Sequence, residues 1–518
     1  MSRRTVVIGS GPAGWASTQG LLQRGVRVTV LDVGHGLEAS LVNRLAGLRE
    51  LASGPNSLSW TSEDIANLTS SDRPTRLAGK LYFGSDVPYR YVDGMGAISS
   101  TTDSVLPVSG SRGGLSNVWG AGALTLSRSD LSTWPVNPDD MIRAYASLSK
   151  LTPLLARADN LDVRYPLVTA PTASPPTSAR FLRVLDHADG VRQHGVLLGT
   201  ARLLAQPLGA GCTGCGRCLT GCPFGAIFDS GRLFGELREH SLVDYRPGVF
   251  VESIRENDRD VELVVRGPAG RRDHIHANRV LVAAGAVASV ALLQRSGMCS
   301  PETNVCDSQV FYLPALLKSR WTSDASLFTL AQVFAVSESG DPESDFQLSL
   351  YDTSSELAKR FAPTAPPQLR RAVGLISPHL AKRLVGGIGF LHSDVSGSLR
   401  VSTLNGETKV TPIRSEKTGP ALASVLRKLR RALGQAGVEL VTPLVQVPEP
   451  GEGFHVGSAL PMAAEASPSG TDPLGRPLGV QRVHVVDATV LPQLHPGPTT
   501  YTAMANALRI ASTISDSQ

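Results

Sequence analysis

Four of the six cysteines in the chain lie within eleven consecutive positions. Their spacing, C-x2-C-x2-C-x3-C followed by Pro223, is that of the ligand run of bacterial ferredoxins, in which thiolates bind iron–sulfur clusters. The sequence contains no second run of this kind, so we expect one 4Fe-4S cluster bound by the thiolates of Cys212, Cys215, Cys218 and Cys222. Two alternatives are a zinc site, which usually takes two C-x2-C pairs from separate loops, and a cysteine turn without a ligand.

A glycine pattern close to the N-terminus suggests a second kind of chemistry. Gly9, Gly11 and Gly14 form G-x-G-x-x-G directly after the β-branched run Thr5–Ile8. In a dinucleotide-binding turn the first glycine permits the tight turn, the second lets a pyrophosphate approach the backbone, and the third lets helix pack on strand. Asp32, at the end of the next expected strand, would accept hydrogen bonds from ribose hydroxyls. The pattern predicts a dinucleotide site, with a glycine-rich turn without a ligand as the alternative, and it does not distinguish NAD from FAD.

Distant segments favour FAD. The blocks 111–120, 279–297 and 483–511, together with Trp134-Pro135 before an expected helix, follow one another in a characteristic order. In this order they resemble the glucose-methanol-choline (GMC) family of flavin oxidoreductases. The resemblance extends over nearly the whole chain in scattered blocks, and it implies FAD as the cofactor.

The resemblance also implies cofactor-binding residues. The region of Gly113, Gly114 and Asn117 is expected to line the flavin by backbone contact. The region of Asp487 and Ala488 is expected at the pyrophosphate and the ring end of FAD.

The family's catalytic pair is a histidine in a block similar to residues 454–458, and a His or Asn shortly before the last helix. His455 is the first of these, but Pro498 stands where the second is expected. His495, three residues earlier, is the candidate replacement, or His455 acts alone. The expected chemistry is oxidation of an alcohol: His455 removes the hydroxyl proton while hydride passes from carbon to flavin N5.

A cluster next to a flavin favours a dehydrogenase, because a 4Fe-4S cluster carries one electron at a time. We expect oxidation of a CH-OH group, preferably of a sugar, glycoside or other polyol, with electrons passed singly to an external acceptor protein or a quinone-like carrier. Two alternatives are an electron-transfer subunit without an organic substrate of its own and the reverse, reductase reaction.

These sites require an α/β fold with a Rossmann-like FAD-binding domain of GMC type and a second α+β substrate domain built on an antiparallel sheet. The FAD-binding domain is expected to gather residues 1–134, 205–300, which carry the cluster loop 211–223, and 450–518. Residues 135–204 and 301–449 would form the substrate domain. Alternating residues predict strands at 346–350 and 398–401, and apolar spacing predicts an amphipathic helix at 419–434.

Composition excludes several other classes of protein. The 518 residues include 50 Lys and Arg against 45 Asp and Glu, too small an excess for a nucleic-acid binder. The longest nearly apolar run, 280–293, is too short to cross a bilayer, so we expect no integral membrane segment. Six cysteines are too few for a disulfide scaffold, which favours reduced thiols and a cytoplasmic location.

Overall fold

The computed structural model describes residues 4–52, 81–93, 96–219, 221–267, 270–318, 328–352 and 383–514. A five-stranded parallel sheet carries the N-terminal glycine turn, with the strand order β19-β9-β1-β2-β5. The strands are β1 (Thr5–Ile8), β2 (Val28–Asp32), β5 (Val243–Pro247), β9 (Arg279–Val282) and β19 (Val483–Val485). Strands β1 and β9 are buried on both faces, which explains their continuous apolar sequence.

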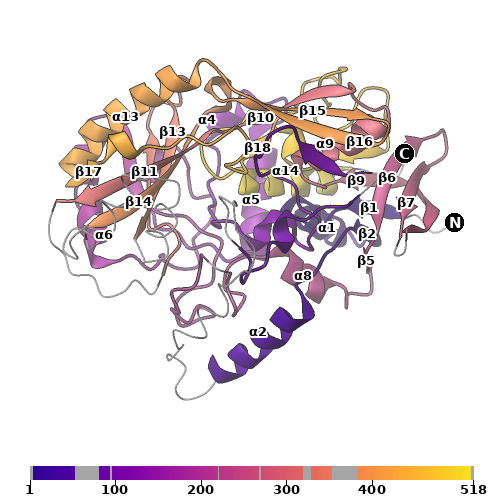
Figure 1. The fold of residues 1–518 in the computed structure, drawn as a ribbon, viewed down its shortest axis with the longest axis horizontal. Helices are drawn as coiled ribbons and strands as arrows, with labels where there is room; N and C mark the ends of the chain where they lie inside the picture. The colour runs from indigo at the N-terminus through magenta and orange to yellow at the C-terminus, as the bar shows by residue number, and fades with distance from the viewer. Residues whose placement is uncertain are drawn as a thin grey trace.

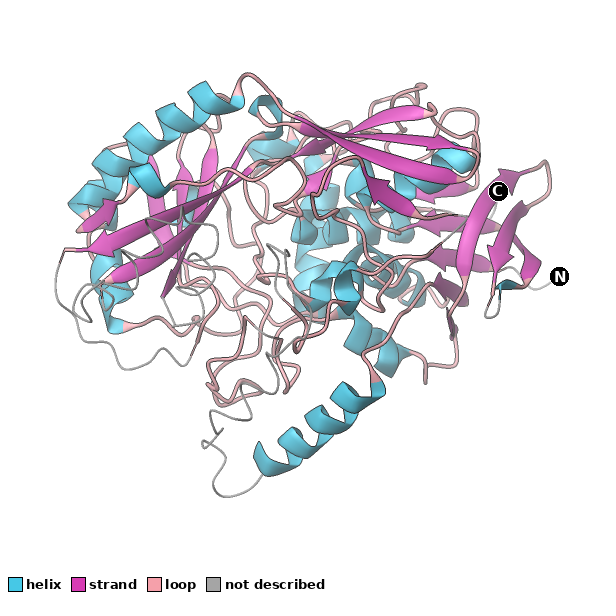
Figure 2. Ribbon diagram, in the orientation of Figure 1, coloured by secondary structure: helices cyan, strands magenta, loops and turns pink. Residues whose placement is uncertain are grey.

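Helices cover this sheet (Figures 1 and 2). Helix α1 (Pro12–Leu22) packs against the C-terminal helix α14 (Thr500–Thr513), and a Cβ at Gly20 would lie 3.0 Å from that of Ala511, so the two helices approach closely. Helix α5 (Pro138–Leu151) packs on the other side of α14. The other α-helices of the described residues are α2 (Ala39–Ala52), α4 (Arg128–Leu131), α6 (Ala179–Leu185), α7 (Ala188–Arg192), α8 (Ser230–Leu237) and α9 (Ala286–Arg295), besides α13 below.

A six-stranded antiparallel sheet lies at the opposite end of the molecule, with the order β17-β11-β14-β13-β12-β4 (Figure 1). Its strands are β4 (Val196–Thr200), β11 (Val310–Leu317), β12 (Val333–Ser337), β13 (Phe346–Asp352), β14 (Leu384–Leu391) and β17 (Val438–Leu440). Helix α13 (Thr418–Gln435) covers one face and buries Leu422, Val425, Leu429 and Leu433 in the core shared with the sheet. The predicted amphipathic helix is therefore confirmed, and the other face of the sheet is free to form a cavity wall.

Two smaller sheets complete the fold. One has the order β18-β10-β15-β16-β3, and the other is the antiparallel β6-β7-β8. Their strands are β3 (Ile98–Ser100), β6 (Phe250–Glu256), β7 (Val261–Arg266), β8 (Arg272–Ala277), β10 (Glu302–Asp307), β15 (Ser398–Leu404), β16 (Glu407–Ile413) and β18 (Val456–Gly457). Strand β15, expected near 398–401, is antiparallel to its neighbours, and it packs with α9 in a core separate from that of β13.

The predicted fold class is confirmed, because a parallel nucleotide-binding sheet is combined with antiparallel sheets. The domain boundaries stay a prediction. None of the helices in the described ranges combines the length and apolar character that a bilayer crossing needs.

Candidate active site

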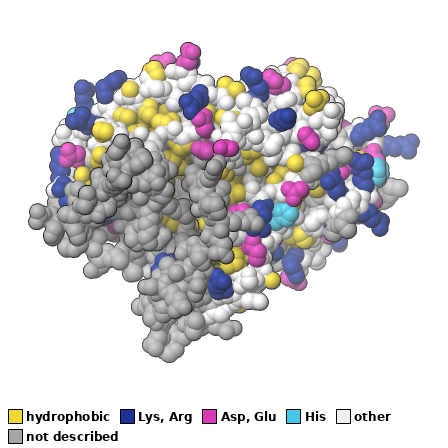
Figure 3. All heavy atoms as spheres, viewed as in Figure 1, with side chains coloured by type: hydrophobic (Ala, Val, Ile, Leu, Met, Phe, Trp, Pro, Cys, Tyr) yellow, Lys and Arg dark blue, Asp and Glu magenta, His cyan; other side chains and the backbone are white. Residues whose placement is uncertain are grey.

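One cavity of about 890 Å³ extends from the carboxyl edge of the parallel sheet to the six-stranded sheet. Gly9, Gly11 and Asp32 line one end, and Tyr312 and Phe390 line the other. The carboxyl ends of β1 and β9 meet where the strand order reverses, which is where open α/β sheets bind their ligands. Figure 3 shows apolar side chains gathered across the middle of one face of the molecule and charged side chains mainly around them.

The three glycines of the N-terminal pattern have different environments. Gly9 has φ +100°, and a Cβ there would lie 2.5 Å from the carbonyl oxygen of Ala283 at the end of β9. A Cβ at Gly14 would lie 2.1 Å from the carbonyl oxygen of Gly9, so this glycine permits the close packing of α1 on the turn. Gly11 has no atom within 4 Å of such a Cβ, and it lines the cavity at the N-terminus of α1. The open space beside Gly11 is where a phosphate group can approach the helix N-terminus.

Asp32 lies at the end of β2 in the wall of the cavity. The hydroxyls of Ser10 and Tyr245 both donate to its Oδ2, at 2.5 and 2.7 Å. Burial raises the pKa of Asp32, and these hydrogen bonds oppose the rise. The Gly113 N–H donates to Ser10 Oγ at 2.8 Å, so the hydrogen bonds connect the glycine turn to Asp32.

Some residues of the 111–120 block line the cavity, and others lie behind its wall and support the turn. Gly114 lines the cavity, and a Cβ on it would lie 3.7 Å from the Cα of Gly11. Gly113 faces α8 instead, where a Cβ would lie 2.4 Å from the nitrogen of Gly231. The amide of Asn117 donates to Ser111 Oγ, which braces the turn from outside the cavity wall.

Asp487 and Ala488 both line the cavity next to β19. The carboxylate of Asp487 accepts hydrogen bonds from the N–H of Gly285, at 2.9 Å, and from the hydroxyl of Ser289, at 2.6 Å. Its other oxygen accepts from the N–H and hydroxyl of Thr489. Asp487 therefore fixes the turn between β9 and α9 against the segment that carries Ala488.

His455 lies in the cavity wall directly before β18. Its ring stacks on Phe390, with the ring centres 4.0 Å apart and the planes at 25°. Burial lowers the pKa of His455 to about 4. Its Nδ1 is buried without a hydrogen-bond partner in the described part of the structure.

The backbone around His455 is strained. Phe454 and Ser458 have φ of +60° and +50°, a region that side-chain-bearing residues rarely adopt. A Cβ at Gly457 would lie 2.4 Å from the carbonyl oxygen of Ala488, so the segment fits closely against the wall that Asp487 fixes. Strain of this kind often marks a functional site.

Pro498 lines the same cavity, whereas His495 does not. The rings of His495 and His392 are 5.5 Å apart, and the Gln493 amide lies 3.2 Å from His495 Nε2. Burial lowers the pKa of His495 to about 4. The structure thus brings His455 and Pro498 to the cavity and leaves His495 in a neighbouring cluster.

The comparisons with known proteins agree with this geometry. Residues 420–507, which include His455, Asp487 and Pro498, match the family model of the GMC oxidoreductases. Over this segment the chain is similar to the C-terminal part of the GMC oxidoreductases. Among solved structures, it is similar to pyridoxine 4-oxidase from Mesorbium loti, with 14% sequence identity, 98% of each chain covered and a TM-score of 0.60. No curated protein matches the chain in sequence.

The family match over residues 420–507 and the similar fold agree with the resemblance to GMC oxidoreductases that the sequence suggested. One wall residue that the sequence did not reveal is Arg295, the last residue of α9. Its guanidinium stacks over Phe250 at 5.3 Å, and its Nη1 is buried without a partner among the described residues. No local pattern marks Arg295, because only the packing of α9 places it at the nucleotide end.

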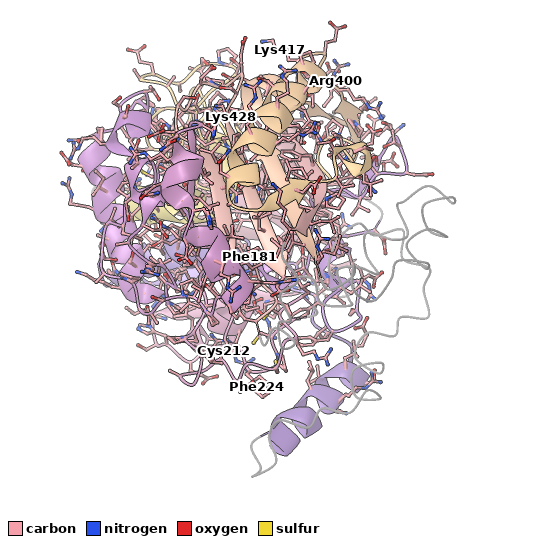
Figure 4. All side chains as sticks on the ribbon, turned by 90° about the vertical axis from the view of Figure 1, so that its left-hand side faces the viewer. Phe181, Cys212, Phe224, Arg400, Lys417 and Lys428 are labelled. Atoms are coloured by element: carbon pink, nitrogen blue, oxygen red, sulfur yellow. The ribbon has the colours of Figure 1, made fainter. Side chains whose placement is uncertain are left out.

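The four clustered cysteines line another, small cavity of about 20 Å³, away from the histidines. Phe224 and Phe328 also line it, and Figure 4 shows Cys212 and Phe224 near each other at the lower edge of the molecule. The Ala226 N–H donates to the sulfur of Cys222 at 3.2 Å. Burial raises the pKa of Cys215 to about 11 and also raises that of Cys212, while backbone N–H groups of Arg217 and Gly214 oppose these shifts.

All six cysteines are free thiols. Within the described ranges, no group of three or more His, Cys, Asp or Glu residues is arranged to hold a metal ion. The predicted iron–sulfur site is therefore not confirmed. Leu219, next to Cys218 in the same loop, reaches the wall of the large cavity, so the cysteine loop adjoins this cavity.

Proposed function

We propose that the protein is an FAD-dependent alcohol dehydrogenase in which His455 is the catalytic base. One observation carries this proposal: a single cavity connects the open space beside Gly11 to the ring of His455. An external one-electron acceptor, either a protein or a quinone-like carrier, would receive the electrons through a 4Fe-4S cluster bound by the cysteine loop. The cytoplasmic location expected from the free thiols belongs to the same proposal.

The residues at the nucleotide end fit FAD. Gly11, Gly114, Asp32 and Ala488 form the wall that would contact the cofactor. Gly9, Gly14, Gly113, Asn117 and Asp487 would shape this wall through the packing and hydrogen bonds described above. Bound FAD supplies the two-electron acceptor for the oxidation of an alcohol.

His455 suits the removal of a proton from a bound alcohol. With a pKa near 4 the imidazole is neutral at ordinary pH, and a neutral imidazole is a base. Because Nδ1 is buried, Nε2 is the atom that would take the hydroxyl proton. Pro498 has no group that exchanges protons, so we propose that His455 acts alone and that His495 has a structural role.

Anaerobic stopped-flow reduction of the flavin by alcohols tests this assignment. We expect His455→Ala to retain FAD and to slow flavin reduction by roughly 10²–10⁴-fold, the usual contribution of a general base. His495→Ala should reduce at close to the parent rate, as should the exposed control His194→Ala.

The reverse result, a parental rate for His455→Ala with failure of His495→Ala, would transfer the role of base to His495. If FAD and cluster are present but no alcohol reduces the flavin, the alternative of an electron-transfer subunit replaces our proposal.

The cysteine loop supports a cluster through its chemistry. Four thiols line one cavity, and backbone N–H groups point at three of the sulfurs, as expected around thiolates that carry negative charge. A cubane cluster takes each thiolate on a different iron, so its ligands need not converge on one point. Such a cluster supplies a one-electron carrier next to the flavin cavity.

Metal analysis of anaerobically purified protein tests whether the cysteine loop binds a 4Fe-4S cluster. We expect about four irons and four sulfides per chain. Cys215→Ser should lose most of both while its flavin remains reducible by substrate, and Cys299→Ser, outside the loop, should retain them. Stoichiometric zinc, or unchanged turnover with a one-electron dye in a cluster-free Cys215→Ser variant, would contradict the proposal.

A further inference from the structure

The part of the cavity beyond His455 is formed by one face of the six-stranded sheet. Strand pairing places Tyr312, Ile388, Ser349 and Phe334 in one row across β11, β14, β13 and β12. All four side chains line the cavity, as the two-residue period of strands requires. Tyr351 and Phe390 lie on the same wall.

This wall is aromatic and uncharged. None of the residues that the described parts of β11 to β14 contribute to the cavity lining carries a charge. Tyr351 and Phe390 are each 8% exposed, so their remaining accessible surface is small and confined to the wall. A substrate rich in hydroxyls would leave many of these groups without hydrogen-bond partners against such a surface, which costs free energy for each group. The wall therefore disfavours the sugar or polyol that we expected from the sequence.

The position of His455 beside this wall indicates which carbon atom of a bound substrate would react. Phe390 stacks on His455, so the base lies at the edge of the aromatic surface. A planar ring that packed on this surface beside Phe390 would direct a substituent at its edge towards the imidazole of His455. An alcohol carbon bonded directly to the ring satisfies this geometry.

Hydrogen bonds along β13 fix one polar group in the wall. The amide of Gln347 donates to Ser349 Oγ at 2.9 Å, which leaves the Ser349 hydroxyl proton for the phenol oxygen of Tyr351. Burial raises the pKa of Tyr351 to about 12, so the phenol keeps its proton. Tyr351 O–H is therefore the donor available to a polar substituent on a bound ring.

We infer that the substrate is an uncharged arylmethanol, an aromatic ring bearing a CH2OH group, stacked on the wall formed by Tyr312, Phe334, Tyr351, Ile388 and Phe390. This inference rests on the proposed function. Oxidation takes the hydroxyl proton to His455 and one hydrogen with the bonding electron pair to FAD, which leaves an aryl aldehyde. Two equivalents of the one-electron acceptor named above would then take the two electrons, one each.

Anaerobic flavin reduction with matched alcohols tests the substrate class. We expect benzyl alcohol to bind more tightly than cyclohexylmethanol, which has similar size but no aromatic ring, by roughly two- to twelvefold in the Kd taken from the concentration dependence of flavin reduction, the factor that ring–ring contact provides. Sorbitol and glucose should be far poorer. Benzaldehyde should bind the oxidised enzyme and perturb the flavin absorbance, which is a readout independent of turnover.

Substitutions in the sheet test which residues cause the preference for aromatic alcohols. Phe390→Leu should reduce the benzyl-to-cyclohexyl ratio towards one and weaken benzaldehyde binding, whereas Phe311→Leu, at a buried ring on the opposite face of the sheet, should not. Because either variant can destabilise the sheet, Tyr351→Phe provides a second test: it should lower the ratio of kcat/KM for 3-methoxybenzyl alcohol to kcat/KM for benzyl alcohol, since only the methoxy group can accept from the lost hydroxyl. Equal or better reduction by cyclohexylmethanol or sorbitol would overturn the substrate class and leave the proposed function intact. Failure of every alcohol would instead reject the proposed function.

Discussion

At the scale of single residues, the proposed role of His455 as base makes the pH dependence of the reaction follow the protonation of this ring. Burial lowers its pKa to about 4, below its ordinary value of 6.5, and a base acts only in its neutral form. We expect the rate of flavin reduction to be independent of this group above about pH 5 and to fall about tenfold per pH unit below pH 4. Stopped-flow rates across pH, measured with a substrate that does not titrate, check this.

The lowered pKa of His455 also makes the free energy of unfolding depend on pH. Between pH 6.5 and 4 the unfolded chain binds a proton at His455 that the folded chain does not bind, so the free energy of unfolding falls as pH falls through this window. His455→Ala should flatten that part of the curve of unfolding free energy against pH.

A rate of flavin reduction that instead rises through pH 6 to 7 would show that burial of the His455 ring does not control its pKa in the working enzyme.

At the scale of elements, we propose that the N-terminus of α1 and the glycine turn before it bind the pyrophosphate of FAD. A side chain at Gly11 meets no protein atom, so it would occupy the space proposed for the pyrophosphate. We expect Gly11→Val to fold and to be purified without FAD, as measured by flavin absorbance per chain. Gly190→Val provides the control, because Gly190 in α7 is equally open and lies outside the cavity wall. Full FAD content in Gly11→Val would show that the turn does not contact the cofactor.

At the scale of the whole molecule, the cavity has walls from both the parallel sheet and the six-stranded sheet, so a bound cofactor joins parts that are distant in the sequence. A ligand that binds only the folded state stabilises it by about 2.7 kcal/mol when its free concentration is 100 times its Kd. Addition of FAD to apoprotein should therefore raise the melting temperature measured by calorimetry. The Gly11→Val protein should show no such rise, and an FAD-independent melting temperature in the parent protein would contradict this coupling.

Local signals in the sequence were sufficient for the nucleotide-binding half of the fold. Strand β1, helix α1 and strand β2 lie where Thr5–Ile8, the glycine turn and Asp32 indicated. Helix α13 likewise matches its apolar spacing. These features depend on backbone geometry and on periodicity within a few residues, which the sequence contains directly.

The composition of the cavity wall depended on tertiary structure. The sequence suggested Gly113, Asn117 and His495 as site residues, but packing turns Gly113 towards α8 and leaves the other two outside the wall of the large cavity. The aromatic row from Tyr312 to Phe334 gave no local signal, because its members come from four strands and meet only through their pairing register. The sequence by itself thus determined the dinucleotide turn, the cysteine spacing and the histidine at 455. Tertiary structure decided which side chains share the cavity, because contacts between distant segments depend on strand register and helix packing rather than on neighbours in the chain.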